Sequence, residues 1–525
     1  MNAVLDRAGG EPKRADDMLQ AWLPADAAPW TPDFEAWPPA EAQRWRAVLA
    51  RSTAGAVALL ADRPLDAMLR ERIEALQSRS VRWVACDAAT LDALLGLGAA
   101  RFRALDSIAD GLAGPAADTS AQELSVLHLA DQASPVVRLL DSTLYDALHD
   151  GVSDVHFECT PRGMAIRYRI DGVMLAVQQV DGVPVAEQLV SRLKVMAELD
   201  VGERRLPQDG RFKLRIDARE VDFRLSIMPS VFGEDAVVRV LDRASIERAQ
   251  GQLTLEALGF ETATAQTVRT LARQPHGMLL VTGPTGSGKT TTLYAAITET
   301  HTGSDKIVTI EDPVEYQLPG VVQIPVNEKK GLTFARGLRS VLRHDPDRVM
   351  VGEIRDAETA QIAVQAALTG HLVFSTVHAN SAFDVIGRFM HMGLDMYNVV
   401  SALNAVLAQR LVRINCTHCR TPAIPPHAML ARYGLEGASR GLHAFARGTG
   451  CAHCRHTGYK GRRAVSELLM LDDELRDLIA ARAPLVKLKE AARGRGLVSL
   501  RDTALAAVCR GETTFEELER VTLDG

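Results

Sequence analysis

One stretch, "GPTGSGKT" at residues 283–290, limits the possible folds of this chain more than any other. It follows an apolar run, "MLLVT", and precedes a helix-forming run, "TTLYAAITET". Between a strand and a helix, glycines let backbone N–H groups turn toward phosphate oxygens, and the helix N-terminus adds partial positive charge. A chance glycine-rich turn seldom combines these features, so the stretch predicts a strand–loop–helix unit that binds phosphate.

The loop predicts a site for ATP or GTP with Mg²⁺. Lys289 should reach the β- and γ-phosphates, and the hydroxyl of Thr290 should ligate Mg²⁺. Helical stretches separate the strand candidates "KIVTIED", "RVMVGEI" and "LVFSTVH", which is typical of a parallel sheet covered on both faces. The residues expected to hold the nucleotide are Gly283, Pro284, Thr285, Gly286, Ser287, Gly288, Lys289, Thr290 and Thr291.

The composition is that of a soluble globular protein with several domains. The 525 residues exceed what one core usually holds. The 60 basic and 66 acidic residues give a net charge of −6, which argues against broad, charge-driven nucleic-acid binding. The chain has no apolar run long enough to span a membrane and no secretory signal at its start, so we expect a cytoplasmic protein.

Changes in composition and in residue pattern along the chain predict α/β domains joined by linkers. Alternating helical and strand patterns fill the first part, a Gly-, Ala- and Pro-rich stretch follows, and strand-like runs such as "VDFRLSIMP" build a middle domain. The predicted segments are an N-terminal docking domain 1–115, a linker 116–134, a middle domain 135–245, a linker 246–252, a nucleotide-binding core 253–411, a cysteine-containing subdomain 412–458 and a C-terminal helical subdomain 459–525.

Acidic residues follow two of the predicted core strands. "VTIEDPVE" supplies Glu311, Asp312 and Glu315, and "VMVGEIRD" supplies Glu353. Ligands of open α/β sheets lie beyond the carboxyl ends of the strands, so both clusters should face the same site as the loop. A solvated turn is the alternative for any single carboxylate.

Two CxxC pairs predict a metal site. They are Cys416 with Cys419 and Cys451 with Cys454. Four thiolates complete a tetrahedral Zn²⁺ site, and in a reducing compartment such pairs indicate metal more than disulfides. The metal would stabilise the segment between them, residues 420–450, which has little core of its own.

Four segments resemble, in order, motifs of the secretion ATPases that power type II secretion and type IV pilus assembly. They are "GPTGSGKTTTLYA", "TIEDPVEY", "LRHDPDRVMVGEIRDAET" and "TGHLVFSTVHAN", and the resemblance extends from about Ser134 to the C-terminus. It implies a RecA-like P-loop core, a preceding PAS-like α/β domain, a zinc-binding subdomain and a small N-terminal α/β domain. It also implies that Glu315 activates the attacking water, that Glu353 holds Mg²⁺ through water and that His378 senses the γ-phosphate.

Four arginines match positions that this family uses around the nucleotide. Arg339 and Arg343, four residues apart, should share one helical face. Arg224 and Arg239 belong to the middle domain and would approach from outside the core. An arginine stabilises the charge that spreads over the γ-phosphate during transfer, although a solvated surface position is the default for each.

The expected protein is a hexameric motor that hydrolyses ATP. The resemblance implies an inner-membrane platform protein and a membrane adaptor as partners, with peripheral association through them. Type II secretion, type IV pilus extension and, less favoured, nucleic-acid translocation by the same core remain alternatives. The acidic balance and the absence of a basic–aromatic stretch count against the last.

Overall fold

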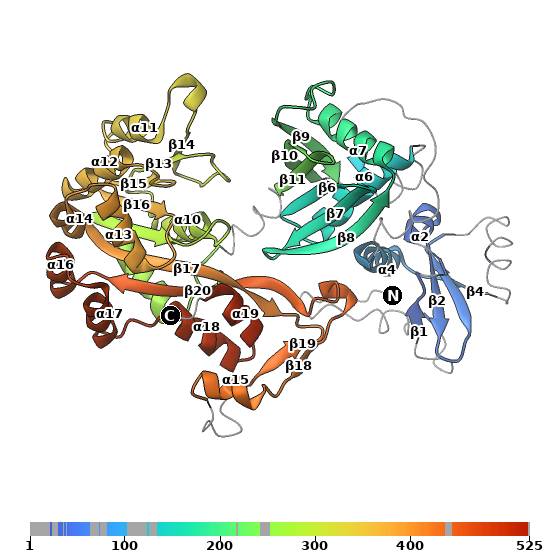
Figure 1. The fold of residues 1–525 in the computed structure, drawn as a ribbon. Coiled ribbons are helices and arrows are strands. Elements are labelled where there is room, and N and C mark those ends of the chain that lie inside the picture. Colours follow the sequence, from blue (N-terminus) through green and yellow to red (C-terminus); the bar gives the residue numbers. More distant parts are fainter. Residues whose placement is uncertain are drawn as a thin grey trace. The chain divides into compact units, whose positions relative to one another are not determined.

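The computed structural model describes two compact units, Met1–Ala244 and Ser245–Gly525 (Figure 1). The described residues are 22–23, 30–34, 36–37, 39–63, 73, 81–101, 123–124, 134–216, 219–241, 253–435 and 444–522. The predicted linker 246–252 and most of the linker 116–134 lie outside them. Most of residues 64–77, one of the helical patterns of the first part, also lies outside them. Within the described part, no helix has the length and apolar character needed to cross a membrane.

The first unit begins with a small four-stranded sheet. Its order is β1-β2-β3-β4, with β3 and β4 parallel and the other pairs antiparallel. Buried tryptophans anchor it, and the indole of Trp37 donates to the carbonyl of Ala47 at 3.1 Å. The elements are β1 Trp30–Pro32, α2 Pro39–Trp45, β2 Ala47–Ser52, β3 Val57–Ala61, β4 Arg82–Ala85 and α4 Ala88–Arg101.

The middle part of the first unit is a seven-stranded sheet with the order β5-β9-β10-β11-β6-β7-β8. Alternate residues of its strands are buried, as in β9, where Phe212, Leu214 and Ile216 point into the core. Apolar faces of α6 and α7 pack on that core. The elements are β5 Glu123–Leu124, α6 Pro135–His149, β6 Asp154–Thr160, β7 Gly163–Ile170, β8 Val173–Asp181, α7 Val183–Met196, β9 Gln208–Ile216, β10 Arg219–Ser230 and β11 Gly233–Leu241.

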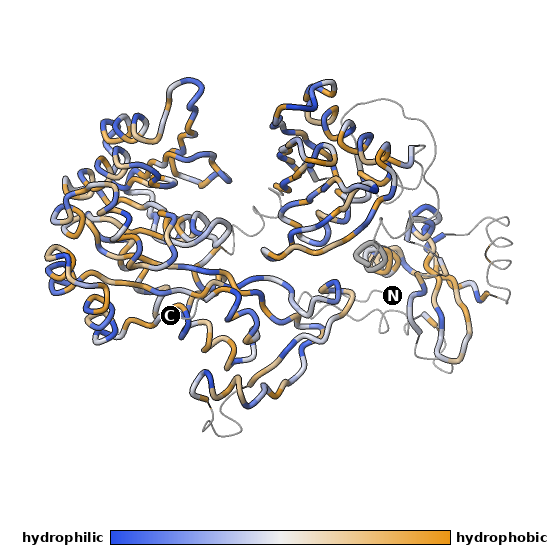
Figure 2. The backbone as a smooth tube through the Cα atoms, in the orientation of Figure 1, coloured by the Kyte–Doolittle hydropathy of each residue, from blue (hydrophilic) through white to orange (hydrophobic). Residues whose placement is uncertain are grey.

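The second unit is built on a seven-stranded sheet with the order β14-β13-β15-β16-β12-β17-β20. All neighbouring pairs are parallel except β17 with β20. The strands are β12 Gly277–Thr282, β13 Ile307–Glu311, β14 Val322–Pro325, β15 Arg348–Val351, β16 Leu372–Val377, β17 Leu403–Asn415 and β20 Tyr459–Met470. Every residue of β12 and β16 is buried, and orange hydrophobic segments run through the region of this sheet in Figure 2.

Helices cover both faces of this sheet, as the apolar strands require. Met278 and Leu280 of β12 share a core with α11–α14, α16 and α17, whereas Leu279 and Val281 share one with α9 and α10. The helices are α9 Thr262–Leu271, α10 Lys289–Thr300, α11 Phe334–Val341, α12 Ala357–Leu368, α13 Ala382–His391, α14 Met396–Ala402, α16 Asp473–Ala480, α17 Leu485–Gly494, α18 Leu500–Cys509 and α19 Phe515–Val521.

The strands β17 and β20 also carry the cysteine-containing segment. β17 continues past residue 411, where the sequence sets the end of the nucleotide-binding core, and stops one residue before Cys416. β20 begins five residues after Cys454 and returns into the core sheet. Between them lie β18 Arg420–Pro422, α15 His427–Arg432, β19 Ala446–Gly448 and the short 3-10 helix η4 Ala452–Cys454.

A buried carboxylate fastens α19 to β17. Glu517 is 1% exposed and accepts hydrogen bonds from the Arg413 side chain, at 2.6 and 2.9 Å, and from its backbone N–H, at 2.9 Å. Arg520 donates to the same carboxylate at 2.7 and 2.8 Å. Burial alone would raise the pKa of Glu517, but the bonds from Arg520 and Arg413 outweigh it and lower the pKa below its ordinary value.

Glu517→Gln should therefore destabilise the second unit by about 3 kcal/mol at neutral pH, because it removes the buried anion that pairs with Arg413 and Arg520. The exposed neighbour Glu516 provides the control Glu516→Gln. The folded pKa lies below the unfolded value, so the extra stability of the parent chain is present above pH 4.5 and disappears as the pH falls through the folded pKa. Urea unfolding of the three chains between pH 3 and 8 measures this; equal stability of parent and Glu517→Gln would contradict it.

Candidate functional site

The glycine-rich loop after β12 is closed on one side and open on the other. Gly283 and Gly288 have φ angles of +150° and +82°, and Gly288 directly precedes α10. A Cβ atom on Gly283 would lie 2.4 Å from the carbonyl oxygen of Gln409 on β17. A Cβ atom on Gly286, where φ is +77°, would meet no protein atom within 4 Å. The loop is thus fixed against the sheet, while its open side can receive a phosphate chain.

Lys289 lies inside this loop. Its side chain is almost fully buried and donates to the carbonyls of Gly283 at 3.0 Å and Pro284 at 3.1 Å. Burial lowers the pKa of the Lys289 ammonium, and the nearby Glu353 carboxylate offsets this only in part. Thr290 and Thr291, which begin α10 with it, are half-buried. The first turn of α10 therefore presents one cation and two hydroxyls at the loop.

Glu353 and His378 meet beside Lys289 because β15 and β16 end at the same edge of the sheet as β12. The Nε2 atom of His378 lies 3.3 Å from Oε2 of Glu353. Burial would raise the pKa of the Glu353 carboxyl, but the hydrogen bond and charge of Arg355, at 2.6 Å, hold it below its usual range. Burial, followed by the charge of Lys289, lowers the pKa of His378. At neutral pH the site thus holds an ionised carboxylate and a largely neutral imidazole.

The first acidic cluster divides between the interior and the surface. Glu311 is buried and accepts hydrogen bonds from the hydroxyls of Tyr294 and Thr309, the latter at 2.5 Å. The expectation that its whole cluster faces the nucleotide loop is therefore wrong for Glu311. Asp312 lies 3.8 Å from Arg355, which also binds Glu353. Glu315 is exposed. Arg355 therefore connects the two acidic segments, and Glu315 remains accessible from solvent.

The four cysteines of the CxxC pairs lie together in the second unit. Their sulfur atoms are all within 4.8 Å of one another. The backbone N–H groups of Cys451 and Gly458 each lie 3.3 Å from the sulfur of Cys454, and although burial opposes them, these bonds lower the pKa of Cys454 to about 7. Four converging sulfur atoms suit a soft, tetrahedral metal ion. The rings of His418 and His453 stack on each other at 4.0 Å.

Comparison with known proteins assigns a family. The family model described as "Type II/IV secretion system protein" matches residues 129–520. This chain belongs to that family. It is similar to Type II secretion system protein E of Aeromonas hydrophila, with 46% identity over 393 residues that cover 75% of this chain and 77% of the relative. It is also similar to Type II secretion system ATPase E of Vibrio cholerae, with 44% identity over 401 residues that cover 76% and 78%.

Solved structures agree on the fold of this family member. The Legionella pneumophila ATPase DotB has a TM-score of 0.52 and 20% identity, covering 73% of this chain and 94% of its own. The Yersinia pseudotuberculosis ATPase DotB has a TM-score of 0.53 and 19% identity, covering 73% and 93%. The predicted α/β fold with a RecA-like core is confirmed, and the strands expected from "MLLVTG", "KIVTIED", "RVMVGEI" and "LVFSTVH" are β12, β13, β15 and β16.

The arginines that the family resemblance selected occupy two settings. In the second unit, Arg339 pairs with Glu358 at 2.5 Å. The helix α11 ends at Val341, so Arg343 lies beyond its end, and instead of sharing a helical face it donates to the carbonyl of Arg339 at 2.8 Å. The guanidinium of Arg343 therefore occupies the end of the helix, where carbonyls are free to accept.

In the first unit, Arg224 on β10 stands opposite Arg239 on β11. Arg239 donates to Asp154 at 2.9 Å, and these three residues line a groove of about 450 Å³. Like charges placed directly across a sheet repel each other, and the Asp154 carboxylate beside Arg239 offsets this repulsion.

Sequence reasoning missed Gln409, which holds the loop to β17. Its buried amide donates to the carbonyl of Ser287 at 2.7 Å and accepts from the hydroxyl of Thr292 at 2.7 Å. The signal was present in "LNAVLAQRLV", where a polar side chain interrupts an apolar strand and so requires buried partners.

Gln409→Leu should leave two buried polar groups without partners and lower the free energy of unfolding by about 2 kcal/mol. The loosened loop should also weaken ATP binding about tenfold, which corresponds to about 1.4 kcal/mol. Gln361→Leu, at an exposed position on α12, is the control. Urea unfolding and titration with a fluorescent ATP analogue give both values, and an unchanged affinity would refute the positioning role of the amide.

Proposed function

We propose that this chain is a hexameric ATPase that drives pseudopilus assembly and protein export in type II secretion. The observation that carries the proposal is the convergence of Lys289, Glu353 and His378 at one edge of a parallel sheet. It is supported by relatives named for type II secretion that align over about three quarters of the chain. The hydrolysed bond is the terminal anhydride of ATP.

The residues of the loop suit the groups that ATP requires. Backbone N–H groups on the open side of the loop and the ammonium of Lys289 bind the phosphates. Mg²⁺ would be held by the Thr290 hydroxyl and, through water, by Glu353, where it would neutralise phosphate charge. Both groups are oxygen donors beside the loop, and Glu353 stays ionised at neutral pH because Arg355 lowers its pKa.

Glu315 and His378 take part in different ways. Glu315 is exposed after β13 and is proposed to orient and deprotonate the attacking water. His378 is proposed to sense the γ-phosphate. Its ring lies beside Glu353, and its lowered pKa keeps the imidazole largely neutral, so its contact with Glu353 can be replaced by one to phosphate. The negative charge that develops on the γ-phosphate would be met by arginines.

Those arginines are proposed to arrive from more than one part of the assembly. Arg339 and Arg343 belong to the second unit, and Arg224 with Arg239 belongs to the first. A site completed by residues from another domain or subunit favours a closed ring, and hydrolysis would then shift one unit against another. The proposed partners are an inner-membrane platform protein and a membrane adaptor, which keep the ring at the cytoplasmic face.

Type IV pilus extension by the same machinery is the alternative. The relatives reported above are named for type II secretion and favour export. Nucleic acid is not a proposed partner, because the net charge of −6 gives no general attraction to phosphates.

Two substitutions separate binding from hydrolysis. Glu315→Gln should bind ATP normally and lose at least about a hundredfold in kcat, because general-base assistance contributes at that scale. Lys289→Ala should lose ATP binding itself. Glu490→Gln, on an exposed face of α17, should behave as the parent. Phosphate release and equilibrium nucleotide binding are measured on the same preparations; a Glu315→Gln chain with parental kcat would refute the role of Glu315.

Zinc is the proposed ion of the cysteine cluster. Elemental analysis should find about one zinc per chain, lost when Cys416 and Cys451 are both changed to Ser. Cys509→Ser, which removes a thiol outside the cluster, should keep the metal. Chelation should lower the melting temperature of the parent and leave that of the double variant unchanged. A metal-free parent chain would contradict the assignment.

A further inference from the structure

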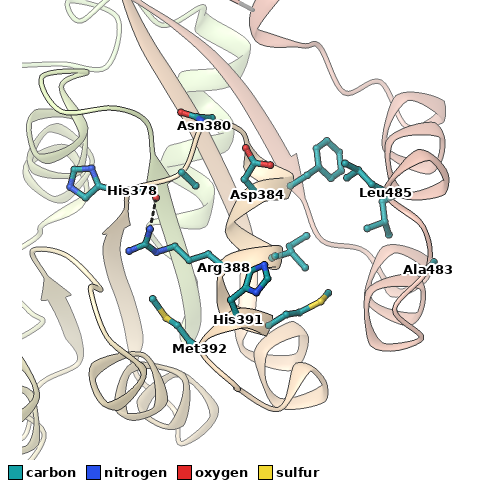
Figure 3. A pocket seen from close by; sticks show the side chains of 14 residues that line it. His378, Asn380, Asp384, Arg388, His391, Met392, Ala483 and Leu485 are labelled. Atoms are coloured by element: carbon teal, nitrogen blue, oxygen red, sulfur yellow. Dashed lines mark hydrogen bonds between the residues drawn. The ribbon is translucent and has the colours of Figure 1, made fainter.

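The segment that carries His378 is fastened at three successive carbonyls by three different elements. Arg388 of α13 donates to the carbonyl of His378 at 3.0 Å, and Figure 3 shows this bond among the labelled side chains. Thr282, the last residue of β12, donates to the carbonyl of Ala379 at 3.0 Å and accepts from its N–H at 3.0 Å. Arg410 of β17 donates to the carbonyl of Asn380 at 2.8 Å.

Arg410 differs from the other two because it also binds the backbone that supports the phosphate loop. Its Nη1 atom donates to the carbonyl of Gln409 at 3.2 Å. That carbonyl is the one against which Gly283 packs, with only 2.4 Å between it and a Cβ atom placed on Gly283. A single guanidinium therefore joins a carbonyl in contact with the loop to a carbonyl two residues after His378. Since the guanidinium is planar and rigid, it sets the separation of the two segments.

The electrostatic surroundings of Arg410 favour a functional reason for this arrangement. The side chain is half-buried, and burial lowers the pKa of its guanidinium. The carboxylates that face it, Asp384 on α13 and Glu467 on β20, only partly compensate. Its positive charge in turn lowers the pKa of Lys289. A half-buried charge whose hydrogen bonds go to neutral carbonyls adds little stability, so the arrangement is better explained by the geometry that it fixes.

We propose that Arg410 is a positioning residue that keeps His378 in register with the phosphate-binding loop. The inference rests on the proposed ATPase function and adds to it the connection between the loop and the γ-phosphate sensor. By binding both the Gln409 and the Asn380 carbonyls, Arg410 keeps residues 378–380 at a set distance from the backbone that supports the loop. Arg410 acts through His378 and does not itself contact the reacting atoms.

The test compares steady-state ATP hydrolysis and equilibrium ATP binding in the full-length chain. Arg410→Gln should lower kcat about tenfold, as expected for the loss of a charge-assisted hydrogen bond, and change KM by less than about twofold. Arg410→Lys keeps the charge but cannot reach both carbonyls, so its kcat should fall about threefold. Arg493→Gln, exposed in the last turn of α17, should match the parent.

A double-mutant cycle distinguishes positioning from a general structural role. If Arg410 acts through His378, the chain with both His378→Ala and Arg410→Gln should hydrolyse ATP no more slowly than His378→Ala alone. Additive losses would overturn the proposal, as would a parental kcat in Arg410→Gln. A lower melting temperature of Arg410→Lys together with lost ATP binding would identify a purely structural residue and also overturn it. A parent chain without ATP hydrolysis would overturn the proposed function, and this inference with it; an active parent with unaffected variants would overturn only the inference.

Discussion

The register of three parallel strands is the constraint on which the nucleotide site depends. Thr282 of β12 pairs with Val377 of β16 on one side and with Ala408 of β17 on the other. The residue after each of these begins a segment of the site: Gly283 the loop, His378 the proposed γ-phosphate sensor and Gln409 the support of the loop. A parallel ladder has evenly spaced hydrogen bonds, so these three segments leave the sheet at one level. A shift of one residue would separate them and turn each side chain to the opposite face.

Charge is arranged in this site so that Lys289 and Glu353 both have partners before any ligand binds. The ammonium of Lys289 rests on loop carbonyls, and Glu353 is held by Arg355 and His378. The bonds of Lys289 can exchange, because neutral carbonyls compete poorly with phosphate for a cation. The site can therefore take up a highly charged ligand by exchanging hydrogen bonds, with little rearrangement of its backbone.

The sequence was informative wherever a site is formed by residues of a fixed type at a fixed local spacing. The loop, the strand ends at Glu353 and His378, and the four cysteines could all be placed from spacing and residue type. The sequence did not predict the direction of a side chain where that direction depends on tertiary packing. β13 is buried on both sides, so no alternation indicates that Glu311 turns inward to Tyr294. Likewise, nothing in the local pattern of "LRSVLRHDPD" fixes the end of α11 before Arg343. The return of β20 into the core sheet depends on long-range pairing with β17, which a single sequence does not encode locally.

The strand β17 is long enough to cross the predicted boundary at residue 411, so it belongs both to the nucleotide-binding core and to the cysteine-containing segment. Up to Ala408 the strand lies between β12 and β20, and from Gln409 to Asn415 its described partner is β20. Along this stretch it carries the support of the loop at Gln409, the buried ion pair of Arg413 with Glu517, and the start of the metal cluster at Cys416. Seven residues of strand span about 23 Å, so loop and cluster are distant yet share one stiff element. The ion pair lies between them and fastens α19 to the strand, which limits bending. Cys416 directly follows the strand whose earlier part supports the nucleotide loop, so the cysteine cluster and the loop are joined by one continuous stretch of backbone.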